Sequence, residues 1–158
     1  MKRYGINPVV LGLSLVTAVQ VFAASERGSE EQAQEMVNKA VSLIHAQGSA
    51  VAYKTFTDNP GSAFRYKDLF VFVVDFQGTS LANGRQPKMV GKSLIAMRDV
   101  DGNLLIKGII DVVKSRKTGW YGPYKSANPV TKEYERKKTY CEQGDGETAV
   151  CVGVFLGK

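Results

Sequence analysis

The chain is 158 residues long, which by size is one domain with room for one core and a modest cavity. Its formal net charge of +6 is mildly basic, with 21 Lys and Arg against 15 Asp and Glu. A nucleic-acid partner is disfavoured, because the chain begins like an exported protein and such proteins rarely meet nucleic acid. Positive charge gathers between residues 107 and 138, either as a solvated face or as a surface that attracts small carboxylates or an acidic partner.

The first 24 residues have the three-part layout of a secretory signal peptide. A short positive start is followed by an apolar run over 9–22 and by small residues at the cleavage position, Ala23 and Ala24. A membrane anchor is the alternative, but this run of about 14 residues is shorter than the ~20 that a spanning helix needs. We therefore expect removal of residues 1–24, which leaves a periplasmic or secreted domain over 25–158 without a membrane span.

The hydrophobic pattern predicts an α+β domain whose elements follow the order helix, helix, two strands, helix, three strands. Ser29 and Gln32 fit a capping box, and the apolar residues after them recur at helical spacing as far as Gln47. A β-branched and aromatic run over 69–76 predicts a strand covered on both faces. Short turns between consecutive strands favour antiparallel pairing, with the long first helix across one face of the sheet. The remaining elements are expected over residues 49–58, 79–83, 104–117, 119–125, 133–143 and 148–156.

Cys141 and Cys151 bracket a strong turn signal, the Gly-Asp-Gly run 144–146. A hairpin centred on Gly146 would place the two cysteines directly across from each other. Export would bring them into an oxidising compartment, where paired cysteines usually form a disulfide. The alternative, a redox-active or metal-binding pair, lacks the CxxC spacing and a nearby histidine. We therefore predict a disulfide between them.

The sequence gives little basis for an enzyme, a metal site or a cofactor site. His45 is the only histidine, and it lies at the edge of the apolar stripe of a helix, where a packed or rim role is more typical than haem ligation. A GxSxG elbow, a CxxCH motif and a Gly-rich phosphate loop are all missing from the sequence. The acidic residues fall in turns and on helix surfaces. We expect a protein that is not an enzyme and holds no cofactor or metal.

Aromatic and cationic residues are concentrated in the last third of the chain. Tyrosine and tryptophan give a pocket an apolar wall with a polar tip, and a lysine there can pair with a carboxylate. On composition alone, ordinary sheet packing with solvated lysines is the simpler interpretation. The candidate ligand-binding residues are Phe72 on the long strand and, further on, Trp120, Tyr124, Lys137, Lys138 and Tyr140.

Six motifs follow one another in the order that a known family has. They are Leu69–Asp75, Leu81–Gly84 with Pro87–Leu94, Asp99–Gly102, Gly119–Tyr124 with Asn128–Pro129, Lys137–Tyr140 and Val152–Phe155. Over about residues 30–157 the chain thereby resembles single Cache domains of the second type. The resemblance implies a PAS-like antiparallel sheet of about five to six strands, a long N-terminal helix packed across it, and a ligand pocket between the sheet and covering loops.

Such domains usually sense small molecules, often short carboxylates, outside the cell. Members are commonly joined to a membrane helix and a signalling module, and the cysteine pair is not part of the family pattern. We therefore expect a stand-alone domain that acts through a membrane receptor or transporter.

The resemblance points to Lys137, three residues before Tyr140, as the cation that meets a ligand carboxylate. Strict alternation along the strand places Lys138 with Tyr140 on one face and Lys137 with Cys141 on the other. Either a β-bulge between Lys137 and Tyr140 resets the register, or Lys138 binds the ligand and Lys137 faces outward. We favour Lys137.

Two functions compete. The first is a soluble periplasmic module that binds a short carboxylate or a similar anionic metabolite. The second is a structural or protein-interaction module whose pocket is filled by side chains and whose basic surface is the working part. Phe70 stands where a tyrosine is common in the family, which is consistent with a drier pocket and slightly favours the second function.

Overall fold

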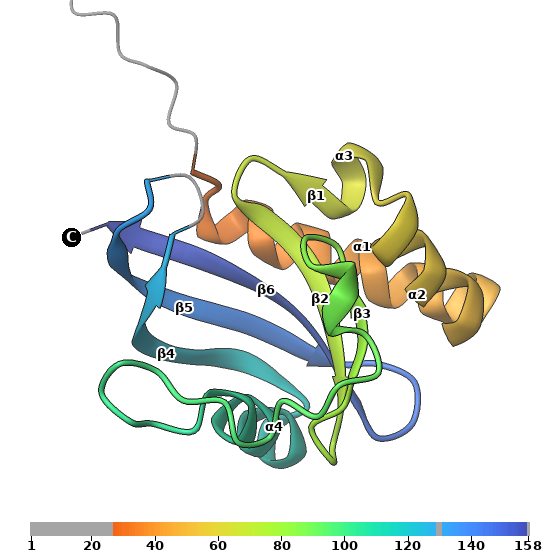
Figure 1. Ribbon diagram of the computed structural model, residues 1–158. Coiled ribbons are helices and arrows are strands. Elements are labelled where there is room, and N and C mark those ends of the chain that lie inside the picture. Colours follow the sequence, from red (N-terminus) through yellow and green to blue (C-terminus); the bar gives the residue numbers. More distant parts are fainter. Residues whose placement is uncertain (1–26, 129–130, 158) are drawn as a thin grey trace, which may run out of the picture.

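A six-stranded antiparallel sheet forms the centre of the structure, a computed structural model that describes residues 27–128 and 131–157 (Figure 1). The strand order is β1-β2-β6-β5-β4, and β3 also pairs with β2, so that the first long strand lies beside the last. The strands are β1 (Arg65–Tyr66), β2 (Leu69–Asp75), β3 (Ser80–Asn83), β4 (Thr118–Ala127), β5 (Tyr134–Gln143) and β6 (Thr148–Gly157). The helices are α1 (Glu30–Gln47), α2 (Ser49–Asp58), α3 (Gly61–Phe64), the 3-10 turn η1 (Pro87–Met89) and α4 (Leu105–Arg116).

The predicted α+β class and the long helix across an antiparallel sheet are confirmed. Three short elements, α3, β1 and η1, were not predicted, because segments of two to four residues carry no readable period. The predicted signal peptide over residues 1–24 lies outside the described residues. Within the described residues, no helix is long and apolar enough to cross a membrane.

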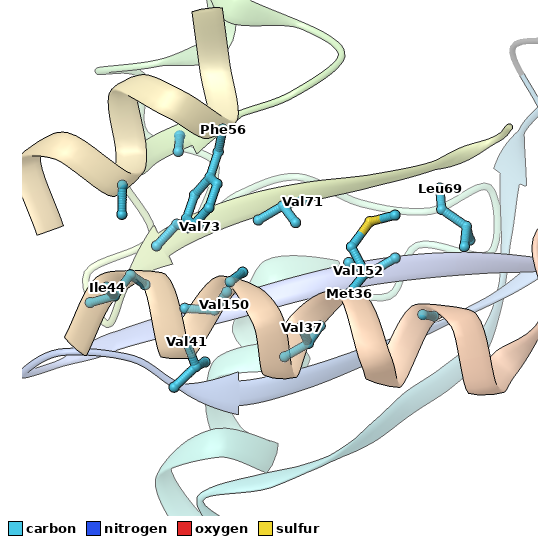
Figure 2. Packing of buried hydrophobic residues seen from close by; sticks show 14 of the residues in the cluster. Met36, Val37, Val41, Ile44, Phe56, Leu69, Val71, Val73, Val150 and Val152 are labelled. Atoms are coloured by element: carbon cyan, nitrogen blue, oxygen red, sulfur yellow. The ribbon is translucent and has the colours of Figure 1, made fainter. Parts of the chain in front are cut away.

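Helix α1 covers one face of the sheet with a continuous apolar stripe (Figure 2). The capping box fixes its start: the backbone N–H of Gln32 donates to Ser29 Oγ at 3.2 Å, and the N–H of Ser29 donates to Gln32 Oε1 at 3.0 Å. Phe56 of α2 extends the same core and is fully buried. Each large apolar side chain so buried contributes about 1.5–3 kcal/mol. The buried residues of the stripe are Ala33, Met36, Val37, Ala40, Val41 and Ile44.

Helix α4 covers part of the opposite face, so that β2 is buried on both sides, as its continuous apolar run predicts. Along β2, Leu69, Val71 and Val73 face α1, whereas Val74 packs in the cluster of α4. The α4 residues in that cluster are Ile106, Ile109, Ile110 and Val113. The two faces of the sheet are therefore distinct environments, which decides where each site residue can act.

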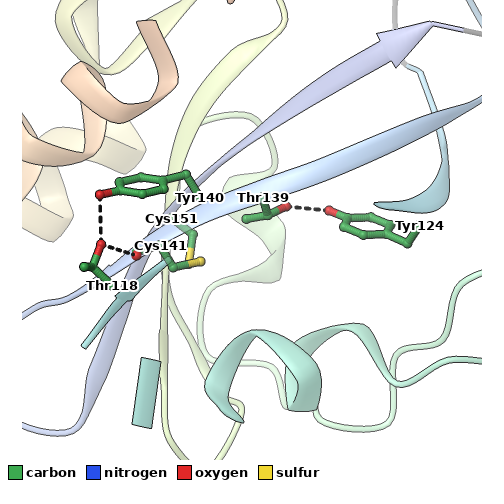
Figure 3. The surroundings of a disulfide bond; sticks show 6 residues. All are labelled: Thr118, Tyr124, Thr139, Tyr140, Cys141 and Cys151. Carbon is green, nitrogen blue, oxygen red and sulfur yellow. Dashed lines mark hydrogen bonds between the residues drawn. A yellow bond between two sulfur atoms is a disulfide. The ribbon is translucent and has the colours of Figure 1, made fainter. Parts of the chain in front are cut away.

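The predicted disulfide joins Cys141 of β5 to Cys151 of β6 (Figure 3). The two residues are direct cross-strand partners, with their Cα atoms 4.2 Å apart. Gly146 adopts a φ of 59° in the connecting turn, and the Thr148 hydroxyl donates to the carbonyl of Asp145 at 2.7 Å. The turn thus sets the register that brings the cysteines together.

Replacing both cysteines with alanine should lower the free energy of unfolding by about 3 kcal/mol, because the cross-link restricts the unfolded chain. Urea unfolding of the oxidised protein and of the C141A/C151A variant measures the difference. Adding reductant to the wild type should give a similar loss and should not change the variant. Equal urea midpoints for the two proteins would contradict a stabilising disulfide.

Candidate functional site

Lys137 is a lysine of β5 that lies almost entirely inside the protein, with 9% of its surface exposed. It lies on the α4 face of the sheet, together with Thr139 and Cys141, because side chains two apart along a strand share a face. A register shift between Arg136 and Lys137 in the pairing of β5 with β6 precedes this run. The alternation from Lys137 to Cys141 is therefore unbroken.

Two aromatic rings flank the ammonium group of Lys137. Its Nζ lies 5.5 Å from the ring centroid of Phe70 and 4.6 Å from that of Phe155, within range of cation–π attraction. Gly153 of β6 provides the space for the lysine stem, since a Cβ there would lie 2.3 Å from Lys137 Cε. A glycine inside an otherwise buried apolar strand here marks the close approach of another side chain.

The charge of Lys137 has no direct partner within residues 27–128 and 131–157, where its ammonium forms neither a hydrogen bond nor an ion pair. Burial therefore lowers the pKa of Lys137 to about 8, an effect opposed by the Asp68 carboxylate and reinforced by Arg85. Asp68 is itself 1% exposed, and burial raises its pKa. Its Oδ1 accepts from the N–H of Gly28 at 2.6 Å, whereas its Oδ2 has no hydrogen-bond partner among the described residues. An anion beside Lys137 would compensate a charge that the described protein leaves unpaired.

Tyr124 brings a hydroxyl to the same face from β4, opposite Lys137 in the β4–β5 pairing. The hydroxyls of Tyr124 and Thr139 share a hydrogen bond of 2.6 Å (Figure 3). Burial raises the pKa of Tyr124 to about 12, so the phenol stays protonated and can donate at neutral pH. Gly122 allows this arrangement, because its φ is 121° and a Cβ would lie 3.0 Å from the Lys137 carbonyl oxygen.

Trp120, Lys138 and Tyr140 lie on the other face of the sheet, against α1. Lys138 Nζ is 2.6 Å from Glu30 Oε2 of α1 and 4.4 Å from the Trp120 ring centroid. The rings of Trp120 and Tyr140 are 5.2 Å apart, and the Tyr140 hydroxyl accepts a hydrogen bond of 2.8 Å from Thr118. These contacts tie the N-terminal turn of α1 to the sheet, and they give Lys138 the carboxylate partner that Lys137 lacks.

The sheet thus separates the predicted ligand residues into two groups of three. Phe72, Tyr124 and Lys137 lie on the α4 face, and Trp120, Lys138 and Tyr140 lie on the α1 face. The pairing of β5 with β4 has a register shift opposite Lys137 and Thr139, but its extra residue lies in β4, between Tyr121 and Tyr124, so β5 itself has no bulge between Lys137 and Tyr140. Lys137 nevertheless faces inward. The strand geometry therefore contradicts the expectation that Lys137 and Tyr140 share one pocket, and the role of Lys137 in ligand binding stays a prediction.

Besides Phe70 and Asp68, four further residues belong to the surroundings of Lys137: Phe155, Gly153, Thr139 and Arg85. Gly153 could have been found from the sequence, as a glycine within a strand. The other three depend on the register of β5 with β6 and on the loop that follows β3.

A separate hollow of about 530 Å³ lies between α4 and β4 and opens to solvent. Tyr124 and Trp120 contribute to its lining together with Asp111 and Arg116, but Lys137 does not. It therefore lacks the buried charge that distinguishes the surroundings of Lys137. No group of three or more His, Cys, Asp or Glu that could hold a metal ion occurs in the part of the chain that the structure describes.

The sheet and its helices define a PAS-like sensor fold, and the comparisons with known proteins agree with it. The family model described as Single Cache domain 2 matches residues 6–155, and the chain belongs to this family. No curated protein sequence matches the chain.

Solved structures of chemotaxis sensor domains have the same fold. A methyl-accepting chemotaxis protein from Vibrio parahaemolyticus RIMD 2210633 is 18% identical, with a TM-score of 0.65 over 80% of this chain and 87% of that one. A periplasmic sensor domain of a chemotaxis protein is 19% identical, with a TM-score of 0.61 over 80% and 89% of the two chains. A Cache chemosensory domain described for carboxylic acid recognition is 18% identical, with a TM-score of 0.60 over 80% and 87%. At these identities the likeness shows the fold alone.

Replacing Lys137 with methionine should raise the stability of the unliganded protein by roughly 1–3 kcal/mol near pH 7, because it removes a buried charge and keeps most of the stem. The unfolded chain has the ordinary lysine pKa of 10.5 and the folded protein a pKa of about 8. Below pH 8 Lys137 is protonated in both the folded and the unfolded protein, so its buried charge lowers the free energy of unfolding by the full amount. Between pH 8 and 10.5 Lys137 loses its proton in the folded protein first, so this destabilisation decreases as the pH rises.

Urea unfolding at about pH 7 and about pH 10 measures this effect. The difference in free energy of unfolding between the K137M variant and the wild type should become smaller as the pH rises. Lys138→Met is the matched control, since it removes a lysine that pairs with Glu30 and should not stabilise the protein. A K137M variant less stable than the wild type at neutral pH would contradict a buried, unpaired ammonium.

Proposed function

We propose that this chain is the ligand-binding domain of an extracytoplasmic sensing system and that it binds a small carboxylate at Lys137. The observation that supports the proposal most strongly is the buried ammonium of Lys137, which has no direct partner among the described residues and lies between the rings of Phe70 and Phe155. The signal-peptide pattern of residues 1–24 and the disulfide support a periplasmic location.

In this proposal, Lys137 donates a charge-assisted hydrogen bond to one carboxylate oxygen, which restores the pairing that burial removed. The Tyr124 hydroxyl donates a second hydrogen bond, and Thr139 holds that hydroxyl in place through the contact of 2.6 Å. The rings of Phe70 and Phe72 lie 6.3 Å apart on the same face and offer apolar contact to a short aliphatic chain. The ligand is bound and not transformed.

The comparisons support the ligand class and the partner only at the level of the family. One solved relative in fold is described as recognising a carboxylic acid, and others are sensor domains of chemotaxis proteins. We extend these properties to this chain and propose that a membrane receptor or transporter reads out the bound state.

The second candidate is an interaction module with a filled pocket, and one observation favours it. Phe70 and Phe155 occupy space next to Lys137, and the hollow between α4 and β4 does not have Lys137 in its lining. In that case the aromatic rings themselves would stabilise the ammonium, and small carboxylates would not bind.

Calorimetry with acetate, propionate and butyrate separates the two candidates. At least one of these acids should bind the wild type, and Lys137→Met should weaken binding about tenfold or more, because a hydrogen bond between charged groups is worth about 1.5–3 kcal/mol. Lys138→Met, one position along the same strand, should bind within about twofold of the wild type, since Lys138 faces α1.

Trp120→Ala adds a second control, because it should lower the melting temperature without changing affinity. Equal loss of affinity in the Lys137 and Lys138 variants would contradict the assignment of the site to the α4 face. Absence of binding by every carboxylate tested would favour the interaction module.

A further inference from the structure

A second concentration of positive charge lies at the end of the sheet where β1 pairs with β2. A hollow of about 500 Å³ there is lined, among the described residues, by three cations and no acid: Arg65, Lys67 and Arg85. These residues come from β1, from the turn after it and from the loop that follows β3. Segments far apart in sequence thus bring like charges together, an arrangement that is unfavourable unless an anion is present.

The arginines are held in place by the backbone around them. The Asn83 side chain accepts hydrogen bonds from the N–H of Arg85 at 3.1 Å and from that of Gln86 at 2.7 Å, and the N–H of Gly84 donates to the Val71 carbonyl at 2.9 Å. The loop that carries Arg85 is therefore fixed to β2. Arg65 donates to the Gly84 carbonyl at 3.3 Å, which ties the two arginines' segments together.

None of the three cations forms an ion pair with a carboxylate of residues 27–128 or 131–157. Lys67 Nζ donates only to the carbonyl of Arg27, at 3.3 Å, and the nearby Asp68 carboxylate is buried beneath the surface, where it accepts from Gly28. By contrast, lysines elsewhere, such as Lys39, Lys54 and Lys107, each pair with an acid four residues away. Among the described residues, the charge of the hollow is therefore left without a carboxylate partner.

The hollow lies next to the proposed carboxylate site. Arg65 is the direct cross-strand partner of Phe70, so their side chains leave the sheet on the same face, the face of Lys137. Arg85 is close enough for its charge to lower the pKa of Lys137. Two centres of unpaired positive charge thus flank the ring of Phe70.

We propose that the hollow of Arg65, Lys67 and Arg85 is a second anion subsite, so that the preferred ligand is a dicarboxylate or a larger polyanionic acid. One carboxylate would meet Lys137, and the other would meet the arginines, whose guanidinium groups can each hold a carboxylate through two parallel hydrogen bonds. The inference rests on the proposed function for the first of these contacts. The second contact depends on Arg65 and Lys67, which are not among the residues described around Lys137, together with Arg85.

Calorimetry with acids matched in chain length tests the inference. The probes are succinate, glutarate and adipate, each compared with the monocarboxylate of the same carbon number: butyrate, pentanoate and hexanoate. At least one diacid should bind the wild type about tenfold or more tightly than its monoacid. Arg65→Gln should remove most of that affinity advantage and leave the monoacid affinity within about twofold, and Arg85→Gln should also remove most of the advantage.

Arg116→Gln is the matched control, because it removes one exposed arginine of α4 outside this hollow and should leave the advantage intact. Diacids that bind no tighter than monoacids, or an advantage that survives both arginine variants, would overturn the inference and leave the Lys137 site standing. Diacid binding that depends on the arginines but not on Lys137 would support the second subsite and overturn the first. Failure of every acid to bind would overturn both.

Discussion

The burial of one unpaired ammonium is the constraint on which the account of this protein depends. A lysine side chain can enter a protein interior only if its charge is compensated or its pKa falls. The described surroundings of Lys137 offer two aromatic rings and the charge of the Asp68 carboxylate, which forms no direct ion pair with it. The fold therefore stores a destabilising interaction that an anionic ligand can relieve. Folding removes water from the Lys137 ammonium, and a bound carboxylate would give that ammonium a new partner. We therefore expect Lys137 to affect both the stability of the free protein and the affinity for the ligand.

The rest of the fold holds that residue in place. Helix α1 anchors one face of the sheet, and its ion pair with Lys138 fixes the neighbouring residue of β5 in the opposite direction. The disulfide pins β5 to β6 on the α4 face, four residues beyond Lys137 and next to the strand pair that contains Gly153. A shift of one residue in this pairing would exchange Lys137 for Lys138 and remove the site. The position of the charge is thus a consequence of register.

The role of Lys137 as a ligand residue stays a prediction, whereas the sequence allowed the architecture and the disulfide to be predicted, because each follows from a local pattern or from the order of the family motifs. It did not allow the site to be assembled. Trp120 and Tyr140 belong to the same family motifs as Tyr124 and Lys137, yet they face α1, because motif spacing does not specify which side of a strand a residue occupies. The grouping of Arg65 with Arg85 depends on a contact between a short hairpin and a loop about twenty residues later, which no periodicity encodes.

The central claim is that the Lys137 ammonium is buried without a partner until a carboxylate binds, and NMR titration of its Nζ and Cε resonances tests this most directly. In the free protein the titration should give a pKa of about 8, well below the ordinary lysine value of 10.5. Saturation with a bound carboxylate should move the pKa upward, since the anion favours the charged form. A Lys137 pKa near 10.5 in the free protein, or one that does not change when a carboxylate is bound, would contradict the account.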